Sequence, residues 1–107
     1  MSGKVQISES EEALQIIKEI ESNSQITQRV LAQKLEVSLG KVNFFINVLI
    51  DKGIIEAKNF KNSRNKLGYM YLLTPAGIKM KLELIRKFII WKTQEYEKLK
   101  EEIDILK

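Results

Sequence analysis

Hydrophobic residues recur at helical spacing in four stretches of the chain, and strand-forming residues fill two short runs between the third and fourth stretches. The first stretch begins at residues 8–11, where the letters SESE have the Ser-x-x-Glu spacing of a helix capping box. We therefore predict a first helix from residue 8 to about residue 21, and a disordered segment over residues 1–7. Its apolar face is expected to hold Ala13, Leu14, Ile17 and Ile20.

The next two stretches predict a helix-turn-helix. One helix should follow an N-cap at Thr27 and run to about Leu35, and the next should begin at a capping Ser38 and end at Lys52, with Gly53 turning left-handed behind it. A tight break at Glu36 separates them, although glycine is common at this place in such turns. The packing positions are filled by Leu31, Ala32, Leu35, Val37, Val42 and Phe45, and the inward stripe of the third helix should be Val42, Phe45, Ile46 and Leu49.

The outward side of this third helix is the candidate reading surface, because a helix-turn-helix presents the start of its second helix to the DNA major groove. Asn43 and Asn47 stand one turn apart, and their amides could pair with adenine edges. Gly40 lowers helix stability but allows a backbone to approach closely. The alternative is an ordinary surface of polar residues with a partly buried Phe44. The candidate contacts are Ser38, Leu39, Gly40, Lys41, Asn43, Phe44 and Asn47.

Two runs rich in strand formers, residues 54–60 and 67–73, flank a polar segment and predict a β-hairpin. Residues 54–73 carry four basic residues and one acidic residue, which is the strongest bias in a chain whose net charge is only +4. In a winged helix this hairpin is the wing, and its tip reaches phosphates or the minor groove. A solvated loop that happens to hold basic residues is the alternative. The candidate wing contacts are Lys61, Arg64 and Lys66.

A long C-terminal helix is predicted from Ala76 to Leu106, after a capping Thr74 and a proline at the first helical turn. Its apolar residues alternate at spacings of four and three, which is a heptad pattern and predicts a dimer formed by this helix. The first half carries a second apolar face, which we expect to pack on its own domain. Folding back of the whole helix is the alternative. The heptad positions are Ile78, Leu82, Ile85, Ile89, Lys92, Tyr96, Leu99, Ile103 and Leu106, and the second face is Leu84, Phe88 and Trp91.

The direction of helix pairing stays open. Glu95 and Lys100 occupy heptad positions g and e, which weakly favours a parallel pair, and the polar Lys92 at a seam position would reduce stability while fixing the register. We assign the dimerisation surface to Ile89, Tyr96, Leu99, Ile103 and Leu106.

Composition excludes much chemistry. The 107 residues include no Cys and no His, which removes zinc sites built from these residues, Ser-His-Asp triads, Cys-His dyads and thiol redox reactions. We therefore expect no enzyme activity, no metal site and no cofactor. No apolar run approaches the roughly 18 residues that span a bilayer, and the N-terminus lacks a signal core, so a cytoplasmic protein without membrane contact is expected.

Three segments resemble transcriptional regulators of the MarR type, in particular the exopolysaccharide-associated group: SLGKVNFFINVLIDKGII, NFKNSRNKLGYMYLLTPAGI and EYEKLKEEIDILK. The resemblance covers about residues 10–107 and implies a dimeric bacterial or archaeal winged-helix regulator. Two differences stand out. Asn65 and Lys66 occupy the positions of an Asp-Arg pair found in many wings, so that salt bridge cannot form, and a single helix follows the wing. By position, the resemblance implies DNA contacts at Leu39, Gly40, Lys41, Asn43, Phe44, Asn47, Arg64 and Lys66.

The sequence thus predicts a mainly α fold with a small β-hairpin. Residues 8–75 should form a winged helix-turn-helix DNA-binding domain, and residues 76–107 a dimerisation helix forming a coiled coil. The expected function is sequence-specific binding of double-stranded DNA by a homodimeric transcriptional regulator. The alternative is a winged-helix protein-interaction module held by a coiled coil. No small-molecule effector can be identified from these residues.

Overall fold

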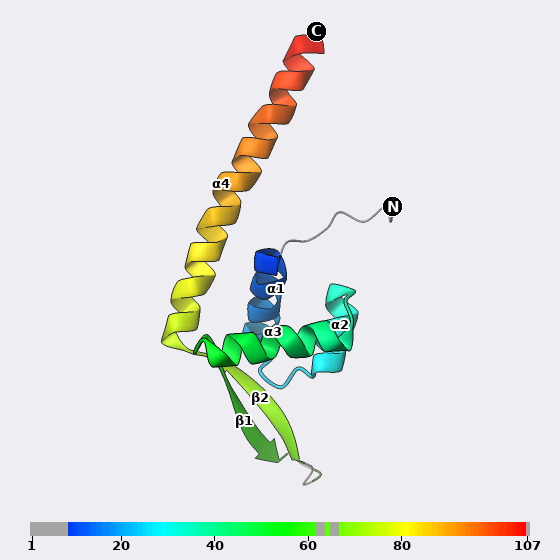
Figure 1. Ribbon diagram of the computed structural model, residues 1–107, viewed down its shortest axis with the longest axis vertical. Helices are drawn as coiled ribbons and strands as arrows, with labels where there is room; N and C mark the ends of the chain where they lie inside the picture. The colour runs from blue at the N-terminus through cyan, green and yellow to red at the C-terminus, as the bar shows by residue number, and fades with distance from the viewer. Residues whose placement is uncertain (1–8, 62–63, 65–66, 107) are drawn as a thin grey trace.

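The computed structural model describes residues 9–61, 64 and 67–106, and in these residues it has the predicted mainly helical fold with one antiparallel hairpin. Every boundary lies within one or two residues of its predicted place. Three short helices form the body, the hairpin extends from one end of it, and the last helix rises toward the opposite end (Figure 1). In chain order the elements are α1 (Glu9–Ser22), α2 (Gln28–Leu35), α3 (Leu39–Asp51), β1 (Ile55–Lys61), β2 (Leu67–Leu73) and α4 (Pro75–Leu106).

Local caps define the helix-turn-helix as predicted. The Thr27 hydroxyl accepts a hydrogen bond from the Val30 amide, and the Ser38 hydroxyl accepts one from the Lys41 amide, both at 3.1 Å. Glu36 adopts the left-handed conformation, with φ of 56°, at a cost of about 1–2 kcal/mol for a residue with a β-carbon. Gly53 ends α3 with φ of 70°. The predicted capping Ser8 lies outside the described residues.

The core fills the space between the three short helices and the base of the hairpin. All four predicted inward residues of α3 are buried, as are Leu31 and Ala32 of α2. The stripe of α1 was predicted correctly at Ile17 and Ile20, which are buried, but Ala13 and Leu14 are only half-buried and the fully buried Ile16 was missed. The cause is a charged residue in the stripe, since Glu12 stands one turn before Ile16 and is itself buried. The buried hydrophobic residues are Ile16, Ile17, Ile20, Ile26, Leu31, Ala32, Val42, Phe45, Ile46, Leu49, Ile54, Ile55 and Tyr71.

The hairpin is attached to the body at its base. Ile55 pairs with Leu73 and Lys61 pairs with Leu67, so the two strands are in register over their whole length. Tyr71 is buried, and its backbone amide donates to the Ser24 carbonyl at 2.8 Å, which joins β2 to the connection between α1 and α2. The base of the wing is therefore anchored to the connection that precedes α2.

A close junction joins the hairpin to α4. The Thr74 amide donates to the Ile54 carbonyl at 3.0 Å, and the Thr74 hydroxyl accepts from the Gly77 amide at 3.0 Å. The same hydroxyl also contacts the carbonyls of Gly53 and Ile54. A β-carbon on Gly77 would lie 2.1 Å from the Ile54 carbonyl oxygen, so only glycine allows this approach. This junction explains why threonine and glycine stand at the first and last positions of the Thr-Pro-Ala-Gly segment.

The first half of α4 packs on its own domain, as predicted, although Trp91 of the predicted packing face is 45% exposed. The second half is exposed. Met80 and Leu84 pack against the core, and Phe88 is half-buried. From Ile89 to Leu106 every residue is exposed, and the molecule reaches 65 Å in its longest dimension (Figure 1). The helix does not fold back. Exposed apolar residues of α4 include the heptad positions Ile78, Leu82, Ile89, Tyr96, Leu99, Ile103 and Leu106.

Lys92 does not simply occupy the heptad seam, as the spacing alone had indicated. Its ammonium lies 3.8 Å from a carboxylate oxygen of Glu11 on α1 and 4.6 Å from the ring centre of Trp91. The reason is that α4 still runs beside α1 at this level, so an opposite charge is within reach. Lys92 therefore joins α4 to α1 in addition to its place in the heptad pattern.

We predict that Gly77→Ala destabilises the fold by roughly 1–3 kcal/mol, because the added methyl would force α4 away from the Ile54 carbonyl. Urea unfolding followed by circular dichroism measures this change. Gly40→Ala is the matched control: no atom lies within 4 Å of its added β-carbon, and alanine is favoured over glycine inside a helix. Equal stabilities for the two variants would show that the junction tolerates a side chain.

Candidate nucleic-acid interface

The outer face of α3 is uncovered. Every residue predicted to contact DNA from this helix and its cap is exposed, while the opposite face forms the core. Gly40 has open space where a side chain would stand. The exposed residues do not form one uniform surface, however, because their side chains lean toward two different flanks of the helix.

One flank faces α2 and the hairpin, and it holds both asparagines. Asn43 and Asn47 line a groove of about 280 Å³ together with Gln28 of α2 and Tyr69 and Tyr71 of β2. Asn47 Nδ2 donates to Asn43 Oδ1, Asn43 Nδ2 donates to Gln28 Oε1, and Gln28 Nε2 donates to the Tyr71 hydroxyl, each at 3.2 Å. A continuous chain of side-chain hydrogen bonds thus links the recognition helix to the wing.

Three groove residues were not predicted from the sequence. Gln28 directly follows the Thr27 cap, so its place at the start of α2 was visible, but its partner Tyr71 is 43 residues away. Tyr71 and Tyr69 share one side of β2, since side chains alternate along a strand. The alternation of side chains along this strand predicts that the two tyrosines share a side, but it does not predict which side faces the recognition helix.

The other flank faces α1, and it holds Lys41. The Lys41 ammonium lies 2.9 Å from Glu12 Oε1, and the Glu12 side chain is only 5% exposed. The second carboxylate oxygen of Glu12 is buried and accepts no hydrogen bond from the residues that the structure describes. Lys41 is therefore the charge partner of a buried carboxylate, and this pairing competes with any contact between Lys41 and a phosphate.

Phe44 also leans toward this second flank. The residue is 60% exposed, and its ring meets that of Phe45 edge to face, with ring centres 5.9 Å apart. It lines an apolar groove of about 280 Å³ between α1, α3 and α4, together with Val48, Met80 and Leu84. Phe44 thus lies at the border between the outer face of α3 and the groove below α4.

The wing places positive charge away from the body. Lys61 is the last residue of β1 and is exposed, and Arg64 at the tip is exposed as well. Lys66, the third predicted wing contact, lies outside the described residues. The exposed side chains of β2 near the tip include Leu67 and Tyr69, so the wing is not purely polar.

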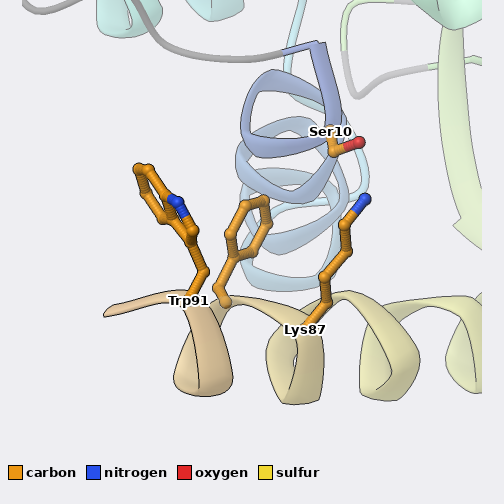
Figure 2. A pocket seen from close by; sticks show the side chains of 4 residues that line it. Ser10, Lys87 and Trp91 are labelled. Atoms are coloured by element: carbon orange, nitrogen blue, oxygen red, sulfur yellow. The ribbon is translucent and has the colours of Figure 1, made fainter. Parts of the chain in front are cut away.

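A further pocket lies away from the recognition helix. It has a volume of about 240 Å³ and lies between the start of α1 and α4, where it is lined by Ser10, Lys87, Phe88 and Trp91. Lys87 and Trp91 project from α4 toward the α1 side that carries Ser10 (Figure 2). Across residues 9–61, 64 and 67–106, no group of three or more His, Cys, Asp or Glu residues is placed to hold a metal ion. Within the same residues, no helix has the length and apolar character to cross a membrane.

Sequence comparison supports the helix-turn-helix assignment. The family described as winged helix-turn-helix DNA-binding matches residues 13–56, which run from α1 to the first residues of β1. No protein of curated function matches the chain significantly.

Solved structures share the fold at low sequence identity. A PadR-like transcriptional regulator from Bacillus cereus aligns with a TM-score of 0.68 and 20% identity, covering 80% of this chain and 89% of that one. The adhesin competence repressor of Streptococcus pyogenes aligns with a TM-score of 0.60 and 17% identity over 88% of this chain and 66% of that one. A mutant MarR from Escherichia coli, complexed with operator DNA, aligns with a TM-score of 0.56 and 24% identity over 75% of this chain and 54% of that one. The fold is thus a winged helix-turn-helix.

We predict that Lys41→Ala lowers the free energy of unfolding by roughly 1–3 kcal/mol, because it leaves a buried carboxylate without its charge partner. Glu12→Gln in the same chain should recover part of this loss, and a double-mutant cycle in urea measures the coupling. Lys34→Ala is the control, since its pair with Glu19 is more exposed and should contribute less than about 1 kcal/mol. A Lys41 variant as stable as the Lys34 variant would show that the pair has no structural role.

Proposed function

We propose that this protein is a transcriptional regulator of the MarR type that binds double-stranded DNA sequence-specifically as a homodimer. The observation that carries the proposal is the uncovered outer face of α3 beside a hairpin with exposed cations at Lys61 and Arg64. An α-helix fits the major groove, and an adjacent wing reaches the backbone or the minor groove. Residues 8–75 would provide the DNA-binding domain and residues 76–107 the dimerisation helix.

The two parts of the interface would have different tasks. Contacts from the wing to phosphates would supply affinity without sequence information, whereas contacts from α3 to base edges would supply selectivity. Ser38, Leu39, Gly40 and Asn47 remain proposed DNA contacts because they lie on the exposed face of α3. Lys41 is proposed as a weaker contact, because Glu12 holds its ammonium.

The type of regulator is inferred from sequence motifs and fold together. The structure of a mutant MarR complexed with operator DNA supports DNA binding by a chain of this fold, and this chain spans about half of that protein's length. The exopolysaccharide-associated group is proposed only from the segments SLGKVN and KNFKNSRNK.

Dimerisation is proposed from the exposed half of α4. Leu99 and Ile103 are 61% and 59% exposed, and they continue a stripe with Tyr96 and Leu106 on the half of α4 in which every described residue is exposed. A regular apolar stripe left in water is unfavourable, and a second copy of the same helix would cover it. Two linked domains would also bind two half-sites with a higher effective affinity.

A protein-interaction module is the second candidate, and the exposed side chains of Leu39 and Phe44 favour it. The deciding experiment selects bound duplexes from a random DNA pool and measures the affinity of the selected duplex at about 50 and 200 mM salt. A DNA-binding regulator should enrich a sequence and lose affinity steeply with salt. No enrichment, with a protein partner bound equally at both salt concentrations, would favour the second candidate.

We predict that Arg64→Ala weakens binding to selected and random duplexes alike and lowers the slope of log affinity against log salt by about one. The physical reason is the loss of one cation at the exposed wing tip. Lys34→Ala removes the same charge on α2, outside the proposed DNA contacts, and should leave the slope unchanged. A slope that Arg64→Ala does not alter would remove this residue from the backbone contacts.

We predict that Leu99→Asp combined with Ile103→Asp yields a folded monomer with much weaker operator binding, because two charges enter the proposed seam. Sedimentation measures the mass, and circular dichroism checks the fold. Lys98→Asp changes the net charge by the same amount one position away from the seam and should remain dimeric. A dimer that persists in the double variant would place the interface elsewhere, for example on the groove that Phe44 lines.

A further inference from the structure

We infer that Gln28 and Tyr71 are positioning residues that present Asn47, rather than Asn43, to a base edge of the DNA, and that adenine is the matched base. This inference rests on the proposed function. It assigns different tasks to two asparagines that the sequence treats alike, and it gives a role to two residues outside the recognition helix.

The hydrogen-bond chain starts from a rigid point. Tyr71 is 5% exposed, its backbone amide is bonded to the Ser24 carbonyl at 2.8 Å, and its hydroxyl accepts from Gln28 Nε2 at 3.2 Å. Gln28 is held in turn at the first position of α2, directly after the Thr27 cap. The amide of Gln28 therefore has one orientation, with Oε1 turned toward α3.

The two asparagines differ in the hydrogen-bonding groups that remain available to an outside partner. Asn43 uses both of its polar atoms inside the protein, because Nδ2 donates to Gln28 and Oδ1 accepts from Asn47. Asn47 uses one N–H of Nδ2, and in the described part of the chain its Oδ1 accepts no hydrogen bond. Asn47 thus keeps the whole of Oδ1 and one N–H for an outside partner, whereas Asn43 keeps one N–H and only one lone pair of an Oδ1 that is already engaged.

The free groups of Asn47 define the partner. In the major groove adenine offers N7 as an acceptor and N6–H as a donor, and a side-chain amide pairs with both. The exposed position of Asn47 beside the wing groove leaves room for such an edge. Because the internal chain already holds the Asn47 amide, binding would not have to immobilise it, which we expect to be worth a factor of about two to ten in base discrimination.

The test uses the selected duplex and its single base-pair substitutions, with dissociation constants measured for the wild type and for four variants. Asn47→Ala should remove the preference at one A·T pair. Tyr71→Phe keeps the buried ring and loses only the hydroxyl, and it should lower the preference at that same pair about two- to tenfold while binding to random duplexes stays unchanged. Gln28→Met, which has a similar length but no amide, should affect the same pair.

Tyr69→Phe is the matched control, because it is the same substitution in the same strand and lines the same groove outside the hydrogen-bond chain. It should leave the base preference unchanged. Preference at that pair retained by Tyr71→Phe, or lost equally at all positions, would overturn the inference. So would a preferred pair other than A·T. A wild-type protein that selects no duplex would overturn the proposed function itself, so the two failures are distinguishable.

Discussion

The approach of α4 to the carbonyl of Ile54 is the contact on which the arrangement of the whole molecule depends. Four elements meet there: α3 at its end, β1 at its start, β2 at its end and α4 at its start. Thr74 satisfies backbone groups on both sides of this meeting point, and Gly77 allows the close distance. One junction therefore sets both the direction of the wing and the direction in which the proposed dimerisation helix leaves the body.

The two flanks of α3 differ in chemical character, because different parts of the body pack beside them. The polar groups that α2 and α3 place on the flank toward the wing are neutral amides, and they are connected to the buried Tyr71. An ion pair and an aromatic ring fill the flank toward α1, where Lys41 balances the buried Glu12 and Phe44 borders an apolar groove. A neutral amide can exchange an internal hydrogen bond for one to a base at little cost, whereas Lys41 cannot leave without exposing an unpaired buried charge. The outer face of α3 is thus better suited to base reading on the side of the wing.

The sequence predicted what depends on neighbouring residues. The caps at Thr27 and Ser38, the turn at Gly53 and the inward stripe of α3 are confirmed, because each is determined within a few residues of chain. Spacing alone also predicted α4 and its exposed stripe. What it missed are contacts between distant segments. Spacing placed Lys92 in a heptad seam, but it could not show that Glu11, far away in sequence, lies beside it.

In the candidate site, too, features set by neighbouring residues could be predicted and contacts between distant segments could not. The exposed residues of α3 could be named from helical periodicity, but their separation into two flanks could not, because it depends on which neighbours pack on each side. Glu12 is the instructive case. A carboxylate in phase with an apolar stripe signals burial and therefore a hidden cation, and the sequence contained this signal, since Glu12 stands one turn before Ile16. Only the fold shows that the cation belongs to the recognition helix.

Rigidity connects these observations to the proposed function. Along α4 no glycine or proline follows Gly77, and the helix is continuous from Pro75 to Leu106. A continuous helix fixed at one end by the Thr74 junction, and packed on the core through Met80 and Leu84, has little freedom to swing relative to the body. If two copies pair along it, the distance and angle between their recognition helices follow from the helix itself. The spacing of half-sites would then be determined by the geometry of the fold rather than by contacts made on the DNA.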